Sequence, residues 1–333
     1  MSRCSPFIFG VGCYGSGGGG GGGATLEIEV YSDAGYTVPA SSFNYGATAY
    51  IKLVPTNITP TTYSFFFRNG TKNAPQVDQP GDTLAWVVTL TGAVTISATA
   101  TQGTAATADA TPFALTSTLV ITKGISFDGV NDFAVSGLPK INLANFSISL
   151  RFKLTSTAGR TPLYSFAALN PSGGRPAQGM YYEANAFTFL SENAYTFAQT
   201  LPWVGDTNSH VFTMRYNSTV AKVEIFIDGV SIGVCPAGVT YTANFWSLVL
   251  GRAYTFTNYG NIKMTDVRVF NHYLTTGEIA TLQTAGAAVG SEVLWYPFAL
   301  ESIGTTSFAT DIVTGYQLAM YNITAPNGIV TYP

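Results

Sequence analysis

The sequence contains few charged residues. Asp, Glu, Lys and Arg make up 10% of its 333 residues, against about 25% in an average soluble domain. The 15 basic and 18 acidic residues give a net charge of −3, and the basic residues are scattered singly along the chain. Because a nucleic-acid-binding surface needs clustered positive charge, we expect no nucleic-acid partner.

Long apolar runs and cysteines are scarce as well. Apolar stretches such as Val293–Leu300 stay far below the roughly 20 residues that cross a bilayer, so no membrane-spanning segment is expected. The three cysteines, Cys4, Cys13 and Cys235, cannot all pair within one chain. No disulfide framework is therefore expected to hold the fold.

Glycine, threonine, serine and aromatic residues are abundant instead, with 35 glycines and 14% aromatics. This composition favours β-sandwiches over a helical enzyme, and the chain is long enough for two domains. Within the run VTISATA, Val94, Ile96 and Ala98 share one face, the period of a half-buried strand. Six strands are predicted in the first third of the chain: Leu26–Val30, Thr48–Val54, Tyr63–Arg68, Thr83–Thr89, Val94–Thr101 and Phe113–Thr122.

The N-terminal 23 residues differ from the rest. A short apolar peptide, SPFIFGVGCY, precedes seven consecutive glycines. A lipid-anchored Cys13 is one interpretation, but the apolar stretch before it is shorter than a signal peptide requires. A flexible linker is another. We favour an anchor in which Pro6, Phe7, Ile8 and Phe9 hold the protein to an assembly, because glycine lets backbones approach closely in a narrow passage.

The segments YSFFFRNG and GAVTISATATQGTAATA resemble the immunoglobulin-like modules that bacteria and viruses use as spacers. This resemblance implies an immunoglobulin-like β-sandwich over residues 24–117. The disulfide and core tryptophan of antibody domains are absent from it.

Four ordered motifs in the second half resemble the concanavalin A-like, laminin-G-like jelly-roll family: ISFDGVNDFAVSG, NFSISLRFKL, SHVFTMRYNSTVAKVEIFIDGVSIG and LVLGRAYTFTNYGNIKMTDVRVFNHYLTTGEIATL. The resemblance implies an all-β jelly-roll sandwich over residues 118–333. The tail that begins LWYPFALE resembles a segment that such domains carry before their FDG motif, yet here it comes last. We therefore expect a circularly permuted sandwich, in which residues 293–330 complete the sheets that begin near Ile125.

The residue patterns agree with this fold. Val223, Ile225 and Ile227 share one strand face before a turn at Asp228-Gly229. In SISLRFKL the alternate residues Ile148, Leu150, Phe152 and Leu154 are expected inside, with Ser149, Arg151 and Lys153 outside. TTGEIATLQ predicts a short helix capped by Thr275 or Thr276, with Ile279 and Leu282 on its buried side.

Calcium is the one cofactor that the family resemblance suggests, as a structural ion held by loop carboxylates and carbonyl oxygens. Asp266 occupies the position of the aspartate before the VRV strand, and Asp128, Asn131 and Asp132 are further oxygen donors in the FDG loop. The alternative is that Asp128 and Asp132 only make turn hydrogen bonds.

Sugar binding would need aromatic rings at loops or strand ends. The candidates are Tyr181, Tyr182, Trp203, Tyr254 and Tyr259. Core packing is the alternative role for each of them.

The sequence gives no support for catalysis. The paired carboxylates of jelly-roll glycosidases are missing, and the nearest acidic pair, Glu224 and Asp228, ends in a turn aspartate. The two histidines, His210 and His272, and Cys235 are expected to be structural.

These observations predict a non-enzymatic adhesion protein on a bacteriophage virion: a spike, fibre or capsid decoration. Its expected partners are capsid or penton proteins at the N-terminus, further copies of itself as a homo-oligomer, and a host-surface glycan. Two outward-facing β modules in a chain without a credible export signal motivate this hypothesis. The alternative is a secreted or lipid-anchored carbohydrate-binding protein on a bacterial cell surface.

Overall fold

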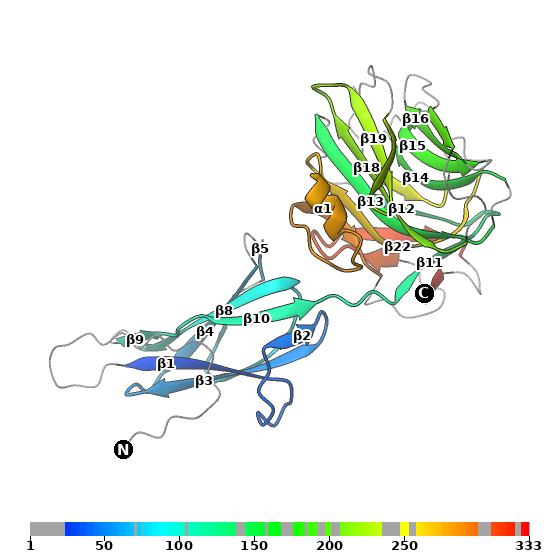
Figure 1. Ribbon diagram of the computed structural model, residues 1–333. Helices are drawn as coiled ribbons and strands as arrows, with labels where there is room; N and C mark the ends of the chain where they lie inside the picture. The colour runs from blue at the N-terminus through cyan, green and yellow to red at the C-terminus, as the bar shows by residue number, and fades with distance from the viewer. Residues whose placement is uncertain are drawn as a thin grey trace.

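A computed structural model of the chain describes most residues from Ala24 onward. The described ranges are 24–69, 72–74, 76–103, 106–137, 144–156, 159–167, 176–183, 186–191, 197–200, 207–234, 247–252, 258–298, 308–323 and 328–332. The predicted anchor at Pro6, Phe7, Ile8 and Phe9 lies outside them. The described residues form two β-sandwiches, joined by the extended segment 119–122 (Figure 1).

Two sheets form the first sandwich. Sheet A has the order β1 (Thr25–Tyr31), β3 (Thr48–Thr56), β7 (Thr83–Val87). Sheet B has the order β2 (Ser42–Asn44), β10 (Phe113–Thr118), β8 (Gly92–Gln102), β4 (Thr62–Asn69), β5 (Lys72–Asn73), with β6 (Val77–Gln79) on β4 and β9 (Ala106–Asp109) on β8. All six strands predicted for this region are present. This two-sheet arrangement is consistent with an immunoglobulin-like module.

Alternation of apolar and polar residues explains the core of this sandwich. Val94, Ile96 and Ala98 are at most 2% exposed, as the period of two predicts. The predicted strand Phe113–Thr122 is too long, because β10 ends at Thr118. Its alternation nevertheless continues to the buried Leu119, where the chain stays extended but leaves the ladder of sheet B.

Two larger sheets form the second sandwich. Sheet C has the order β20 (Val230–Val234), β19 (Lys222–Ile227), β18 (Ser209–Asn217), β13 (Asn145–Leu154), β22 (Asn261–Phe270), β11 (Lys123–Asp128), β26 (Gly328–Thr331), with β23 (Glu292–Tyr296) also on β22. Sheet D has the order β17 (Phe197–Thr200), β16 (Ala186–Ser191), β15 (Pro176–Glu183), β14 (Thr161–Ala167), β21 (Ser247–Leu250), β12 (Phe133–Gly137), β25 (Gln317–Tyr321), β24 (Phe308–Thr310).

The core between sheets C and D contains the residues that periodicity places inside. Val223, Ile225 and Ile227 of β19 belong to it. β19 and β20 are joined by Asp228 and Gly229, which both have positive φ, of 50° and 78°. This is the backbone that two-residue hairpin turns require.

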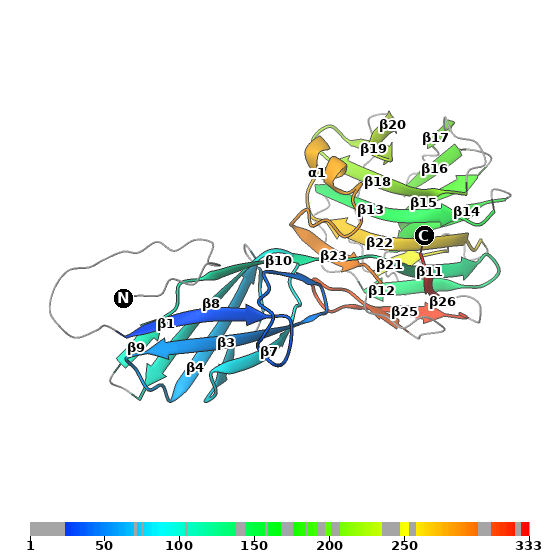
Figure 2. The ribbon, with the colours of Figure 1, turned by 60° about the horizontal axis from the view of Figure 1, so that its bottom comes forward.

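The C-terminal return is confirmed. β26 pairs antiparallel with β11, so that Ile329 lies opposite Ile125. β25 pairs with β12, and β23 pairs with β22. The strands β23, β25 and β26 therefore complete both sheets, as the permuted arrangement predicts. Figure 2 shows β12 and β25 at the opposite edge of the sandwich from β16 and β17.

A bulge in β22 allows this strand to pair with β11 along its first part and with β23 along its second part. Before it, Met264 faces the core and β22 pairs with β11; after it, Val267 faces the core and β22 pairs with β23. The register against β13 shifts at this point, and Asp266 has a φ of 51°. An extra residue of this kind re-aims side chains, and here it directs the Asp266 carboxylate to the outer face of sheet C, beside Arg268.

The helix α1 (Thr276–Thr281) covers that outer face (Figure 1). Thr275, one of the two predicted caps, accepts a hydrogen bond from the Glu278 N–H, and the Glu278 side chain accepts one from the Thr275 N–H. Ile279 and Leu282 pack against Phe226 of sheet C in a second, smaller core. This cover explains why Ser149, expected outside, is only 2% exposed.

Candidate functional site

The structure describes three of the five aromatic residues predicted for sugar binding. Tyr182 of β15 is fully buried, with its ring 5.8 Å from that of Phe187. Tyr181 is 6% exposed, and the guanidinium of Arg160 lies 4.3 Å from its ring centre. These two rings therefore serve packing, the alternative considered above. Trp203 and Tyr254 lie outside the described residues.

Tyr259, the third of them, is part of a cluster on the outer face of sheet D. β12 buries Ala134 and Ser136, so its alternation turns Phe133 outward. β25 places Tyr321 directly opposite Phe133. The Tyr259 ring centre lies 6.3 Å from that of Phe133.

The cluster is a stack of three flat groups. The rings of Phe133 and Tyr321 lie 4.8 Å apart and 8° from parallel, and the guanidinium of Arg252 lies 4.4 Å from the Phe133 ring centre. Because β21 and β25 flank β12 on opposite sides, Arg252 and Tyr321 reach Phe133 from opposite sides. We call Arg252, Phe133 and Tyr321, with Tyr259 beside them, the aromatic stack.

Tyr321 is the exposed end of the aromatic stack, with 47% of its surface accessible. Parallel aromatic rings and a guanidinium over a ring are each favourable arrangements, so Phe133 holds the Tyr321 ring on one side while Arg252 packs on the other face of Phe133. The same sheet face continues through Val135 and Ala319 to Phe308, which is 51% exposed. The site is therefore an open apolar surface rather than a cleft.

A glycine allows this arrangement. Gly251 has a φ of 71°, and a Cβ there would lie 2.7 Å from the Phe127 ring. With no side chain, the chain passes over Phe127 at the end of β21 and brings Arg252 to Phe133. A backbone bridge between Arg252 and Tyr259 then holds the other side of the stack.

The FDG loop beside the aromatic stack is held by its own carboxylates. Asp128 accepts hydrogen bonds from the Val130 N–H at 2.7 Å and the Asn131 N–H at 3.3 Å. Asp132, fully buried, accepts one from the Asp128 N–H at 3.1 Å. Asn322, next to Tyr321, donates to the Asn131 carbonyl at 3.1 Å. The loop therefore offers ordered polar groups beside the exposed ring.

The four predicted calcium ligands do not come together. Asp266 lies five residues along β22 from Asn261, the partner of Asp128, or roughly 16 Å away. Its two oxygens accept hydrogen bonds from Arg268 at 2.7 and 2.9 Å, and one of them also accepts from the Trp295 indole at 2.7 Å. In the described part of the chain no three His, Cys, Asp or Glu residues gather as metal ligands would. Asp266 therefore does not fit a shared site, and calcium binding by Asp128, Asn131 and Asp132 stays a prediction.

The acidic pair weighed for catalysis is held by structural partners. Burial would raise the pKa of Glu224, but hydrogen bonds from Arg215 and Ser231 outweigh it and lower the pKa. Burial would also raise the pKa of Asp228. Hydrogen bonds from His210 and the Val211 N–H outweigh this effect and lower the pKa. A glycosidase acid needs a raised pKa, so neither carboxyl fits that role.

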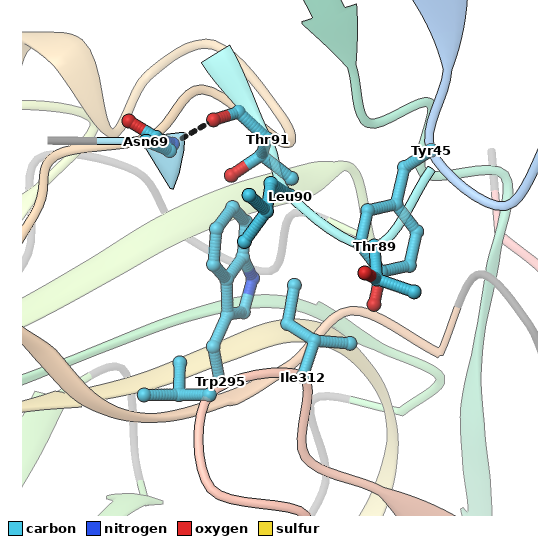
Figure 3. Close-up of a pocket in the computed structure, with 8 residues that line it drawn as sticks. Tyr45, Asn69, Thr89, Leu90, Thr91, Trp295 and Ile312 are labelled. Atoms are coloured by element: carbon cyan, nitrogen blue, oxygen red, sulfur yellow. Dashed lines mark hydrogen bonds between the residues drawn. The ribbon is translucent and has the colours of Figure 1, made fainter. Parts of the chain in front are cut away.

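Figure 3 shows a pocket of about 30 Å³ between the two sandwiches, bounded by Leu90, Trp295 and Ile312 among others. It has room for about one water molecule and none for a sugar ring. The aromatic stack, with its exposed Tyr321 ring and the ordered loop beside it, is the candidate binding site.

Sequence reasoning identified Tyr259 and the FDG loop but missed Phe133, Tyr321 and Arg252. Phe133 was unmarked because a phenylalanine in a strand is usually part of a core, although the small Ala134 and Ser136 that alternate with it indicate the opposite face. Tyr321 could not be placed without the pairing of β25 with β12, which joins residues almost 190 positions apart.

Comparison with known proteins assigns part of the chain. Residues 128–280 match a family model described as the concanavalin A-like lectin/glucanases superfamily. No curated protein matches the sequence. No helix in the described ranges is long and apolar enough to cross a membrane.

Several solved structures share the fold at low identity. A provisionally assigned carbohydrate-binding protein from Bacteroides ovatus is 12% identical with a TM-score of 0.50, over 91% of this chain and 97% of that one. A heptameric pentraxin from Limulus polyphemus is 11% identical with a TM-score of 0.44, over 62% and 98%. The sialidase of Trypanosoma rangeli is 17% identical with a TM-score of 0.38, over 50% of this chain and 28% of the enzyme.

The first of these likenesses concerns the fold alone, and the other two are too weak to support an argument. The family model alone carries the assignment, and the two-sheet architecture of sheets C and D is consistent with it. The second sandwich contains, over residues 128–280, a domain of the concanavalin A-like lectin/glucanases superfamily.

Proposed function

We propose that this protein is a non-catalytic adhesion protein that binds glycans at the aromatic stack. The supporting observation is that Tyr321 exposes its ring at the end of a stack held by Phe133 and Arg252. A pyranose ring has a flat face of C–H groups, and a fixed aromatic ring of similar size can cover it. Binding sites for small molecules combine such apolar surfaces with a few placed polar groups, which the FDG loop supplies here.

Rigidity makes this ring suited to weak ligands. A mobile tyrosine loses rotamer freedom when it is immobilised, at a cost of about 0.5–1.5 kcal/mol for a typical interface side chain. Contact with Phe133, which is itself packed against Arg252, restricts Tyr321 before any ligand arrives. The continuation of the face to Phe308 gives an oligosaccharide further apolar surface on the neighbouring strand.

Substitution of Tyr321 tests this function. In a glycan-array screen followed by titration of the best ligand, Tyr321→Ala is expected to weaken binding about fivefold, because an aromatic contact is worth about 1 kcal/mol. Tyr316→Ala is the matched control, since Tyr316 is 43% exposed but lies at the other end of β25 beside Gly137. Equal affinity of both variants and the unchanged protein for a bound glycan would contradict the assignment of the site.

We place the protein on a virion surface, where residues 1–23 attach a homo-oligomer to capsid or penton proteins and the second sandwich faces the host. The support is the apolar peptide with its glycine run, followed by two consecutive sandwiches along the chain. Deletion of residues 2–23 should abolish incorporation into particles while glycan binding persists. Normal incorporation of the deleted protein would refute the anchor.

A bacterial surface protein is the second candidate, favoured by the likeness in fold to the Bacteroides ovatus protein over 91% of this chain. Both candidates use the same glycan site and differ only in what holds the N-terminus. Mass spectrometry of the native protein separates them, because a chain that starts at an acylated Cys13 supports the bacterial location and an unprocessed N-terminus supports the virion.

A further inference from the structure

The two sandwiches contact each other through more than the connecting segment. The pocket of about 30 Å³ between them is bounded on one side by Tyr45, Asn69 and Leu90 of the first sandwich, and on the other by Trp295, Ile312 and Val313 of the second (Figure 3). We call this region the joint. A space of this size holds about one water molecule, so residues of the two sandwiches approach each other closely around it.

One buried carboxylate positions the turn on the second sandwich's side of the joint. Asp311 is 2% exposed and accepts hydrogen bonds from the backbone N–H groups of Trp295, Val313 and Thr314. The Ile312 N–H donates to the Trp295 carbonyl at 3.0 Å. Ile312 and Val313 are therefore held at the surface by a turn built around one buried side chain.

The Trp295 side chain is held in place by two buried side chains. Its indole N–H donates to Asp266 at 2.7 Å, and the guanidinium of Arg268 lies 3.9 Å from its ring centre. Trp295 is 1% exposed. The second sandwich thus presents a rigid surface to the first.

The first sandwich's side is bound to the connecting segment. Asn69 donates from its side chain to the Thr91 carbonyl, next to Leu90. The Tyr45 N–H donates to the Thr118 carbonyl at 2.9 Å, where β10 ends. The next residue, Leu119, is 2% exposed, and its carbonyl lies so close to Gly286 that any side chain there would collide with it.

We infer that the joint locks the two sandwiches into one fixed orientation. Domains move relative to each other by default unless the contact between them is large and hydrophobic. Here apolar side chains of both sandwiches, Leu90, Trp295 and Ile312 among them, line one small space, and Leu119 of the connecting segment packs against Gly286. The inference does not depend on glycan binding.

One hairpin connects the joint to the candidate site. β24 and β25 are joined by the turn that carries Ile312 and Val313, and β25 ends at Tyr321. Tyr321 lies nine residues from Ile312 along this hairpin, at the far end of the strand. A fixed joint therefore sets the direction in which the aromatic stack faces relative to the first sandwich.

Residual dipolar couplings of backbone amides test the lock, because they report the orientation of each sandwich separately. In the full-length protein both sandwiches are expected to fit one alignment tensor. Ile312→Asp puts a charge into the joint at a half-buried side chain that belongs to neither core, and the common tensor is expected to be lost. Val230→Asp, at a position 66% exposed on β20, should keep it.

Two results would overturn the inference: separate tensors for the two sandwiches in the unchanged protein, or one common tensor in Ile312→Asp. Amide chemical shifts far from residue 312 report whether each sandwich of the variant stays folded. The milder Ile312→Ala provides the same comparison if they do not, with partial loss of the common tensor as the expected result and its full retention as the contradicting one.

Discussion

Single buried residues account for much of the geometry of the second sandwich. Asp266 is 4% exposed and Arg268 is fully buried, with 2.7 Å between their charged groups. The carboxylate also accepts the indole N–H of Trp295. A buried ion pair contributes little net stability over an apolar pair, but removing one partner leaves an uncompensated buried charge.

Asp266→Ala is therefore expected to lower the free energy of unfolding by about 3–5 kcal/mol, measured by urea denaturation of the full chain. Glu183→Gln is the control, since Glu183 pairs with Arg160 at 2.8 Å where both side chains are more than a third exposed. Such a surface pair is worth about 0–1 kcal/mol. A loss below about 1 kcal/mol for Asp266→Ala would show that the buried pair does not hold β22.

Tyr332 links the end of the chain to sheet C, and its buried phenol makes the stability of the fold fall at alkaline pH. Its hydroxyl lies 2.9 Å from that of Ser209, and burial raises its pKa to about 12 despite that hydrogen bond. The folded state thus holds the phenol proton above pH 10, where the unfolded chain releases it. This contribution to stability is complete below pH 10 and is lost as the pH rises towards 12.

Between pH 10 and 12 the unchanged protein should lose about 2 kcal/mol of stability more than Tyr332→Phe does, in denaturant titrations at each pH. The phenylalanine variant keeps the ring but has no proton to lose. If the free energies of unfolding of the two proteins changed in parallel with pH, this would contradict the buried position of Tyr332.

At the scale of elements, most strands follow a period of two, and the exceptions lie where another element covers the outer face of a sheet or where the pairing changes. β13 and β19 bury the alternate residues expected from their sequences. The three-residue β2 and the two-residue β5 are too short to show any period. The bulge at Asp266 has no local signal either, because it arises where β22 changes its partner from β11 to β23.

The turn after β21 is the element that brings Arg252 to the aromatic stack. Gly251→Ala is expected to destabilise the protein by about 2 kcal/mol or more, since it combines a positive φ with a clash against Phe127. Gly159→Ala is the matched control, with a φ of 81° and open space around it. Thermal unfolding of both variants compares them, and equal losses would mean that contact with Phe127 does not matter.

At the scale of the whole molecule, the sequence predicted the architecture better than the site. Four motifs indicated a jelly roll, and the displaced tail indicated the return of residues 293–330, which β23, β25 and β26 confirm. The aromatic stack could not be predicted in the same way. It is assembled from three strands of sheet D that are distant in the chain, and only the pairing of β12 with β21 and β25 places them together.

We propose that the concanavalin A-like domain carries a glycan-binding surface and is held at a fixed angle to the module that precedes it. The central claim is that a sugar lies on the Tyr321 ring. The most direct measurement is an intermolecular nuclear Overhauser effect in protein with isotope-labelled tyrosine rings, using the best ligand from the array. We expect contacts between the Tyr321 ring protons and the C–H face of one sugar, absent in Tyr321→Ala; a bound glycan whose protons contact other tyrosines and not Tyr321 would contradict the account.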